Sequence, residues 1–494
     1  MSNENKVSST QNASQRYKFF KPEERGIELI PAAEQKMKPI SLFWLWAGAI
    51  FNVEFLVYGA LIVSFGLSFG QALVIIVLGN LAYFAVGVMS IQGPITGTTA
   101  MMVGRGVFGR RGNNVPSFFN WITQEGYEVL GLVLVVLLVS SMFTRSGVQV
   151  HDGLKLGILA VAVVVQFILP FLGHAAIEKT LRYLSYIFIV VFTVMAFLVI
   201  PHVDLGKMHQ HASWQLLTSA LVLIVSAGGL GWTENANDYS RYIPSSASKS
   251  RVIFSAALGG MIPSILLEIL GALAYTVSPQ VTAVTGVPSA FAGWFFWPFA
   301  ILALPQLFSI GTIDLYSAGV TLESLGLAIK RTYSVVVNIL VAGIVTFIVV
   351  TKGNLYTDLS GFLDYTLVWL APWFAIYISD YLLRRGRYDL DGLVTDKGGV
   401  YWRNGGFNGK ALVALGLGML AALLWVNGKY YVPSFIGPIS TATGGADFSW
   451  IMGIVVGAIA YYFLSVRSIS KEIALLDTDT ALANGTAGPS NPIV

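Results

Sequence analysis

The sequence predicts an all-α polytopic membrane protein with twelve transmembrane helices. Only 11% of its 494 residues are charged and 55% are hydrophobic, whereas about a quarter of the residues of a soluble domain are charged. Apolar runs of about 18 residues or more, the length that a helix needs to cross a bilayer, recur along the chain. Because lipid offers no hydrogen-bond partners to free backbone groups, such runs are expected to cross as helices.

We expect twelve spans, followed and preceded by polar tails. The spans are approximately 41–66, 69–92, 115–143, 154–173, 181–200, 214–236, 252–277, 291–325, 333–351, 360–383, 411–426 and 448–466. Residues 1–40 are predicted to form a cytoplasmic N-terminal tail, 41–466 the membrane domain, and 467–494 a cytoplasmic C-terminal tail. The N-terminal tail has no apolar core of the kind found in a signal peptide, so the first span is expected to direct insertion.

The distribution of basic residues predicts the orientation. With the N-terminus inside, 25 of the 30 Lys and Arg residues fall in inside segments. The five outside are Arg145, Lys155, Lys207, Lys352 and Lys429. Because cytoplasmic loops of membrane proteins are enriched in Lys and Arg, this bias predicts a multi-pass cell-membrane protein with both termini in the cytoplasm.

Composition and motifs exclude several classes of function. The chain has no cysteine, which excludes disulfides and thiolate chemistry. It has no basic stripe with interleaved aromatic residues, so no nucleic-acid partner is expected. We find no catalytic Ser/His/Asp set, no phosphate-binding loop and no metal-ligand spacing within a span, so we expect neither an enzyme nor a cofactor. The histidines of the segment 201–213, His202, His209 and His211, are interpreted as solvated loop residues and not as a metal site.

The sixth span is interrupted. Its apolar run, 214–225, is followed by three glycines, Gly228, Gly229 and Gly231, and then by Trp232 and Glu234. A broken membrane helix with polar groups at the break is typical of a transporter binding site. The alternative is that the glycines only allow neighbouring helices to approach closely.

The first span has the same character. Gly48, Asn52 and Glu54 lie near its middle, and Gly59 follows. Glycine-interrupted helices at corresponding places of two halves indicate a five-plus-five inverted repeat, with discontinuous spans one and six and with spans eleven and twelve appended.

Five ionisable residues are interpreted as lying near the bilayer centre: Glu54, Glu125, Glu128, Glu268 and Asp314. Each costs about 2.5–3.5 kcal/mol at the bilayer centre, so each is a functional candidate. We expect Glu54 and Asp314 to bind substrate or carry a proton, and Glu268 to make a helix contact. The ring of Tyr127, which lies between Glu125 and Glu128, could stack on a planar ligand.

Several segments together resemble the nucleobase:cation symporter family, in its purine-cytosine permease branch. They are 26–31, 46–59, 92–97, 120–128, 231–242 and 314–317, in the family's order. The resemblance implies a leucine-transporter-type fold, uptake by alternating access, and a flat heterocycle held between aromatic rings of spans three and six.

Residues that match the family's motifs receive their roles from this resemblance. Trp232 corresponds to the stacking tryptophan of span six, and Tyr127 occupies a position that usually holds tryptophan. Asn52 matches the second asparagine of a span-one pattern, and Asp314 replaces an asparagine of span eight. Sodium-coupled members carry two adjacent hydroxyl residues on span eight, where this chain has Phe308 and Ser309. The missing hydroxyl favours proton over sodium coupling.

The sequence therefore predicts a secondary-active symporter that imports a small planar nitrogen heterocycle, such as a nucleobase, hydantoin or vitamin precursor. Substrate contacts are assigned to Trp232, Tyr127, Glu234, Asp314, Glu54, Asn52, Gly228, Gly229 and Gly231, and ion coupling to Glu54, Asp314 and Ser309. A second interpretation treats the carboxylates as negative charges that face one cavity, and predicts a cationic, amine-bearing heterocycle as the substrate. A non-transporting membrane receptor is the alternative from a different class.

Overall fold

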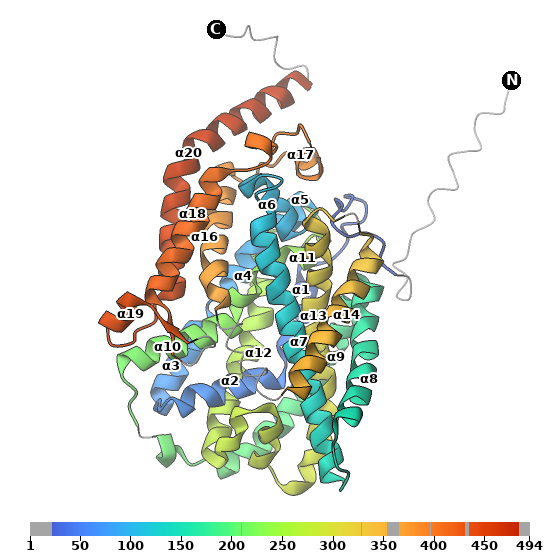
Figure 1. Ribbon diagram of the computed structural model, residues 1–494, viewed down its shortest axis with the longest axis vertical. Coiled ribbons are helices and arrows are strands. Elements are labelled where there is room, and N and C mark those ends of the chain that lie inside the picture. Colours follow the sequence, from blue (N-terminus) through green and yellow to red (C-terminus); the bar gives the residue numbers. More distant parts are fainter. Residues whose placement is uncertain are drawn as a thin grey trace, which may run out of the picture.

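The computed structural model describes residues 22–208, 210–327, 329–352, 365–395, 397–429 and 434–483, with side chains up to residue 476. Over these residues the chain forms a bundle of helices, most of which run along its long axis (Figure 1). The described strands form one short antiparallel ribbon between β1 (Asn427–Gly428) and β2 (Phe435–Ile436).

The described α-helices are α1 (Pro39–Ile50), α2 (Val53–Ser64), α3 (Phe69–Asn80), α4 (Tyr83–Met89), α5 (Gln92–Thr96), α6 (Ala100–Phe108), α7 (Asn114–Arg145), α8 (Asp152–Leu172), α9 (His174–Val199), α10 (Trp214–Ala227), α11 (Ala236–Ser240), α12 (Lys249–Val277), α13 (Phe296–Ser324), α14 (Arg331–Thr351), α16 (Thr366–Arg384), α17 (Leu390–Val394), α18 (Gly409–Trp425), α19 (Pro438–Ala442) and α20 (Ser449–Ala483). The 3-10 turns are η1 (Ile200–His202), η2 (Leu205–Met208), η3 (Gly229–Asn235), η4 (Pro279–Thr282), η5 (Val284–Ala290), η6 (Gly293–Phe295) and η7 (Arg403–Gly405).

Within the described residues, ten helices are long and apolar enough to cross a membrane, and the bent pair α1 and α2 makes eleven if it counts as one span. The predicted eleventh span, 411–426, falls on α18, which at 17 residues is shorter than these helices. The first five residues of the predicted tenth span, 360–364, lie outside the described residues. The many apolar helices agree with the predicted polytopic membrane protein.

The first predicted span is broken in two. Helix α1 ends at Ile50 and α2 begins at Val53, and the two axes are bent by 63°. Asn52 has an extended backbone, and its side-chain Oδ1 accepts a hydrogen bond from the N–H of Glu54 at 2.9 Å. Asparagine is a favourable N-cap because its side chain satisfies a free N–H of the first turn. The asparagine therefore starts a new helix within the span.

The sixth predicted span changes its helix type at the glycines. Helix α10 ends at Ala227, Gly228 leaves the helical conformation (φ −95°, ψ −139°), and the chain continues as η3 and α11. A Cβ on Gly229 would collide with the backbone of Ala82 and Tyr83, at the start of α4. The glycine is thus needed for a close approach of two backbones, in addition to the interruption of the helix.

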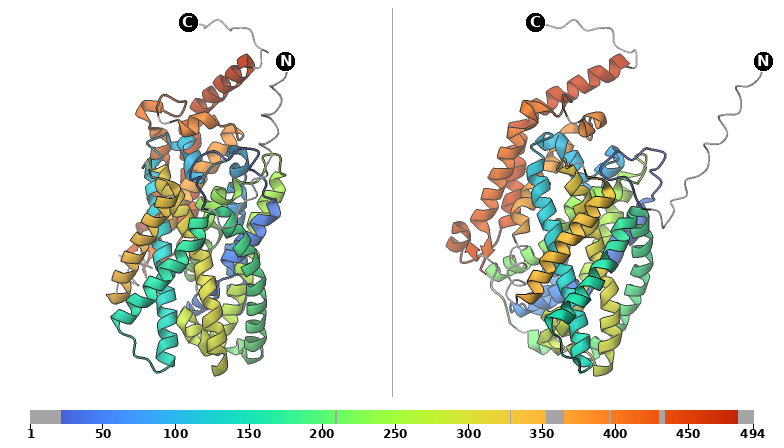
Figure 2. Two further views of the ribbon diagram at one scale, coloured as in Figure 1. Left: turned by 90° about the vertical axis from the view of Figure 1, so that its right-hand side faces the viewer. Right: turned by 45° about the vertical axis from the view of Figure 1, so that its right-hand side comes forward.

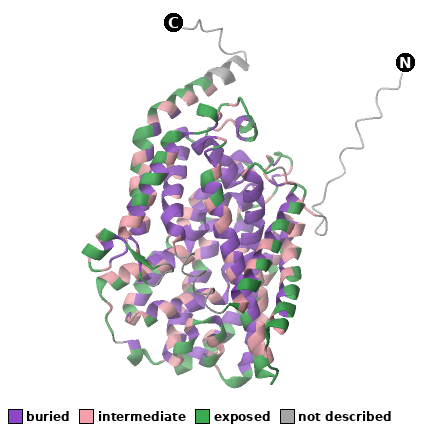
Figure 3. Ribbon diagram, viewed as in Figure 1, coloured by how far each residue is buried: buried purple, intermediate pink, exposed green. Residues whose placement is uncertain are grey.

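Burial separates a central group of helices from a lipid-facing periphery. Buried residues are concentrated in the middle of the bundle, and exposed residues lie along its outer surfaces (Figure 3). Large apolar side chains such as Val161 and Val164 of α8 and Phe197 of α9 are among the exposed ones. Outward-facing apolar residues are expected where lipid replaces water as the solvent.

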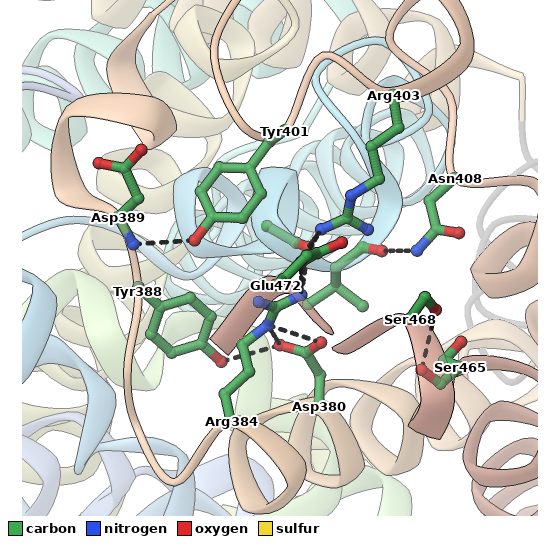
Figure 4. A network of polar contacts seen from close by, with 12 residues as sticks. Asp380, Arg384, Tyr388, Asp389, Tyr401, Arg403, Asn408, Ser465, Ser468 and Glu472 are labelled. Atoms are coloured by element: carbon green, nitrogen blue, oxygen red, sulfur yellow. Dashed lines mark hydrogen bonds and ion pairs between the residues drawn. The ribbon is translucent and has the colours of Figure 1, made fainter. Parts of the chain in front are cut away.

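Helices α16, α18 and α20 pack together along one flank of the bundle (Figure 2). A buried polar network joins their ends (Figure 4). The Nε of Arg384 donates to Asp380 at 2.9 Å, and its Nη2 donates to Glu472 of α20 at 3.0 Å. The hydroxyl of Tyr461, also on α20, donates to Asp380 at 2.7 Å. These contacts attach the last helix to α16.

Two helices continue into sequence that carries basic residues. Helix α6 extends to Phe108 and includes Arg105. Arg105 is buried and donates to the carbonyl oxygens of Leu393 and Ser324. The last helix also continues past residue 466, where the tail was expected to begin, to Ala483.

Candidate functional site

A cavity of about 1150 Å³ lies between the two broken spans and helices α7 and α13. Its inner wall includes residues of α2, α7, η3 and α13, and its outer wall includes residues 282–284, 427, 429, 436, 441, 444 and 445. A pocket of this size, lined by apolar and aromatic side chains with a few polar groups, is the usual form of a small-molecule site.

Trp232 is the largest side chain of this wall. It follows Gly231 in η3, lines the cavity and is 8% exposed. Its Nε1 donates to the carbonyl oxygen of Ala227 at 3.0 Å, a backbone group that is freed where α10 ends. The edge-to-face contact of Trp46, with ring centroids 6.0 Å apart, supports the indole from α1. The indole is therefore held in place and presents a flat apolar surface.

Three carboxyl groups line the same cavity: Glu54 of α2, Glu234 of η3 and Asp314 of α13. Gln124 of α7 donates to the Oε1 of Glu234 at 3.0 Å. Within the described part of the chain, the Oε2 of Glu234 has no hydrogen-bond partner. The breaks in the two spans thus bring together carboxyls that are separated by about 260 positions in the sequence.

Tyr127 of α7 also lines the cavity, together with Tyr58 of α2 and Gly131 of α7. A Cβ on Gly131 would meet no atom within 4 Å, so this position is open space beside the tyrosine. The cavity is therefore bordered by aromatic side chains from α2, α7 and η3. This arrangement can accept a planar molecule.

Four predicted site residues lie outside the cavity lining. Asn52 caps α2 and donates to the carbonyl oxygen of Gln306, and Ser309 donates to the same oxygen at 2.7 Å. Gly228 and Gly229 lie against α3 and α4, near Asn80 and Tyr83, and only Gly231 of the three glycines reaches the cavity. These residues shape the breaks and do not face the cavity.

Sequence reasoning missed three glutamines. Gln306 of α13 accepts a hydrogen bond from the N–H of Val53 through its Oε1, at 3.1 Å. Gln124 contacts Glu234, and Gln166 of α8 donates to Glu128 at 3.1 Å. Each of these amides lies within an apolar predicted span, which is the one signal that could have identified them.

The other intramembrane acids lie away from the cavity. The Oε2 of Glu128 accepts from Gln166, and Glu268 of α12 accepts from Asn80 of α3 at 2.6 Å. Asp238 accepts from the backbone N–H of Ala100 at 3.3 Å. Glu125 is 6% exposed and, among the described residues, neither of its oxygens has a partner. Glu268 makes the kind of helix contact that the sequence predicted.

The opposite end of the bundle is covered by the segment 22–38. Its backbone bonds to Gly97 through Ile30 and to Tyr242 through Met37. Glu23 accepts from the N–H of His174 at 2.8 Å and from the hydroxyl of Tyr242. Burial alone would raise the pKa of the Glu23 carboxyl, but the charges of two nearby arginines and these hydrogen bonds lower it below its usual value.

No group of three or more His, Asp or Glu side chains that could hold a metal ion occurs among the residues that the structure describes. His202 of η1 bonds to the carbonyl oxygen of Leu198, and His209 lies outside the described residues.

Comparison with known proteins places the fold and the family. Residues 29–453 match the family described as permeases for cytosine/purines, uracil, thiamine and allantoin. YxlA of Bacillus subtilis (strain 168), a candidate purine-cytosine permease, is 29% identical over 92% of this chain and 98% of its own. The purine-cytosine permease fcyB of Emericella nidulans is 24% identical over 90% of this chain and 88% of its own.

Two solved structures share the fold. The transporter Mhp1 of the nucleobase-cation-symport-1 family, in a closed conformation with bromovinylhydantoin bound, superposes with a TM-score of 0.71. That comparison covers 92% of this chain and 97% of Mhp1 at 19% identity. The inward-facing conformation of Mhp1 gives 0.68 at 18% identity, over 91% and 96% of the two chains.

The family match spans most of the chain, and it agrees with the helical membrane fold and with the cavity between broken helices. The chain belongs to the family of permeases for cytosine/purines, uracil, thiamine and allantoin, and is a transporter of nucleobase-like substrates and not an enzyme.

Proposed function

We propose that the protein is a secondary-active symporter that imports a small planar nitrogen heterocycle across the cell membrane by alternating access. One observation carries this proposal: the cavity brings the indole of Trp232, the phenol of Tyr127 and three carboxyls together at two helix breaks. Its relatives are purine-cytosine permeases, and the similar Mhp1 structure holds a hydantoin.

In this proposal the heterocycle lies between Trp232 and Tyr127, and its polar edge faces Glu54, Glu234 and Asp314. The surrounding fold has twelve spans, with α18 as the eleventh, arranged as a five-plus-five inverted repeat with two appended spans. Both termini lie in the cytoplasm, so the cavity opens to the outside and the segment 22–38 covers the inner end. The glycines and Asn52 act indirectly, by keeping the spans open.

Protons are the proposed coupling ion. A sodium site needs several oxygen ligands, and the hydroxyl of Ser309 is already bonded to the carbonyl oxygen of Gln306. Its neighbour Phe308 offers no oxygen. Glu54 and Asp314, by contrast, are carboxyls that line the cavity and can exchange a proton with the solvent that enters it.

A thermal-shift screen of the purified protein against nucleobases, hydantoins and vitamin precursors identifies the substrate class, because a ligand that binds only the folded protein raises its melting temperature. Uptake of the best ligand into proteoliposomes then tests transport. We expect unmodified ligand to accumulate against its gradient when the outside is made acidic, and a protonophore to abolish the accumulation. Binding without accumulation would instead favour a receptor, and dependence on a sodium gradient would overturn proton coupling.

A further inference from the structure

The charged side chains of the inner cavity wall are all carboxyls, and this determines which edge of a ring they can bind. The inference rests on the proposed function, because it concerns the charge of the heterocycle that this cavity takes. The three carboxyls come from α2, η3 and α13, and all three line this one cavity. A carboxyl is an acceptor only when it is ionised, and a bound cation favours that ionised form.

These carboxyls are close together and incompletely paired. Asp314 is near enough to Glu54, Glu128 and Glu234 for their charges to interact. The free Oε2 of Glu234 belongs to a side chain that is 1% exposed and faces the cavity. A buried acceptor without a partner is costly, so it indicates a missing donor.

The basic side chains of the described structure do not supply that donor. Among the residues that line the cavity, the one basic side chain described is that of Lys429, which belongs to the outer loop after β1. Arg241 donates to Gly26 and Tyr316 at the covered end, and Arg331 donates to the carbonyl oxygen of Pro170.

The remaining neighbours of the carboxyls bring no positive charge. Asp238 and Glu128 are themselves acids, and they accept hydrogen bonds from Ala100 and Gln166. The N–H of Trp232 is bonded to Ala227. The phenols of Tyr58 and Tyr127 line the cavity but carry no positive charge at neutral pH.

We propose that this cavity binds its heterocycle as a cation of the amidinium type, in which a protonated ring nitrogen and an adjacent amino group face the carboxylates. Two parallel N–H donors match the two oxygens of one carboxylate, and charge-assisted pairs of this kind are roughly twice as strong as neutral hydrogen bonds. The ring then lies on the indole of Trp232, whose face attracts a cation. A ring edge with only carbonyl oxygens would meet the carboxylates with like-signed charge.

In this inference the substrate carries the proton that accompanies transport, in place of the proton that the proposed function assigns to Glu54 and Asp314. A neutral aminoheterocycle takes up one proton in the acidic medium outside, and the resulting cation binds and crosses. Inside, the cation dissociates from the carboxylates and releases the same proton to the cytoplasm. One ring, one proton and one positive charge cross in each cycle.

Three flat probes test this assignment: 2-aminopyridine, which titrates; benzamidine, the fixed cation, whose amidinium group keeps two parallel N–H donors and stays charged over this range; and 2-pyridone, which is neutral. Binding to the purified full-length protein is measured by the quenching of tryptophan fluorescence at several pH values. Because apparent affinity falls with the fraction of the binding-competent form, the Kd of 2-aminopyridine should rise about tenfold per pH unit above that ligand's own pKa. The Kd of the fixed cation should stay constant over this range.

The outcomes separate this inference from the proposed function. If 2-pyridone binds as tightly as the fixed cation, or if all three ligands lose affinity at one common pH, the proton belongs to the protein and the inference is wrong, although import of heterocycles stands. If no ring binds, charged or neutral, both are wrong. A thermal shift with sodium that the fixed cation cannot displace would assign the carboxyls to a metal ion and overturn the inference.

Matched variants test which carboxyl recognises the charge of the ligand. We expect Asp314→Asn to weaken binding of the fixed cation by more than tenfold while changing the affinity for 2-pyridone little. Glu125→Gln is the control, because Glu125 is a buried carboxyl outside the cavity lining, and it should leave both affinities unchanged. Equal losses for cation and neutral ring in Asp314→Asn, with an unchanged melting temperature, would contradict a charge-specific role.

Discussion

The side chain of Gln306 accepts a hydrogen bond from the backbone N–H of Val53, with 3.1 Å between its Oε1 and that nitrogen. Val53 is the first residue of α2, so its N–H has no partner within the helix. The carbonyl oxygen of Gln306 at the same time accepts from the side chain of Asn52. One residue of α13 thus holds the break of the first span.

Gln306→Leu should therefore destabilise the protein, because it leaves the N–H of Val53 buried without a partner. A loss of about 1–3 kcal/mol is expected for such a group, visible as a lower melting temperature in detergent. Gln306→Glu keeps an acceptor oxygen and should lose less. Gln280→Ala, at an exposed position, is the control; an equal loss in Gln280→Ala and Gln306→Leu would mean that the hydrogen bond contributes nothing specific.

Trp232→Ala should abolish specific ligand binding without unfolding the protein, because it removes the flat surface on which the ring is proposed to lie. We expect the affinity to fall at least tenfold, or about 1.4 kcal/mol, in a titration with the best ligand of the screen. Trp214→Ala removes a tryptophan that is 52% exposed at the start of α10 and should have no effect. Retention of full affinity by Trp232→Ala would remove the residue from the site.

Asp380→Ala should be among the most destabilising single changes in the chain, because it removes the fully buried partner of the Arg384 guanidinium and the acceptor of the Tyr461 hydroxyl, and leaves Arg384 paired with Glu472 alone among the described acids. Removal of one member of a buried ion pair costs about 3–5 kcal/mol. Asp152→Ala breaks an exposed pair with Lys155 and should cost at most about 1 kcal/mol. Thermal unfolding of both variants provides the comparison, and similar melting temperatures would show that the network in Figure 4 is weakly stabilising.

Acidification should release the segment 22–38 from the covered end. The pKa of Glu23 is lowered in the folded protein from the ordinary value of 4.5, so its ionised form stabilises the fold above that value. This contribution falls as the pH drops below 4.5 and through the lowered pKa. Hydrogen exchange at the backbone of residues 26–37 should therefore accelerate at acidic pH, after correction for intrinsic rates.

Glu23→Gln should show the faster exchange already at neutral pH and lose this part of the pH dependence. Glu34→Gln is the comparison within the same segment, since Glu34 pairs with Arg25 at a partly exposed position. If the protection of wild type and Glu23→Gln follows the same pH profile, the anchoring role of Glu23 is wrong.

Patterns of hydrophobicity were sufficient to predict the helical membrane fold, because lipid imposes one backbone solution on any long apolar run. The two interruptions could also be anticipated, since the glycines near residue 230 and Asn52 are conspicuous within apolar sequence. The detailed geometry of the two interruptions could not be anticipated. Gly228 and Gly229 serve the packing of η3 against α4, and this contact depends on a partner that is about 150 positions distant in the chain.

The candidate site was predicted unevenly for a similar reason. Trp232, Glu234, Glu54, Asp314 and Tyr127 all line the cavity, because charged or aromatic residues beside a helix break have few other roles. Gln306, Gln124 and Gln166 were not identified, because an amide in a span becomes informative only when its partner is known.

The hydrogen bond between Trp232 and Ala227 also decides what kind of selectivity the site can have. In the proposed site, the single polar hydrogen of the indole is bonded to the backbone, so the indole should support flat rings whatever their hydrogen-bonding pattern. The three carboxyls of the cavity would then discriminate between one heterocycle and another. The affinities of analogues should consequently follow the pattern of hydrogen-bond donors along the ring edge, and differences in ring size should change the affinity little.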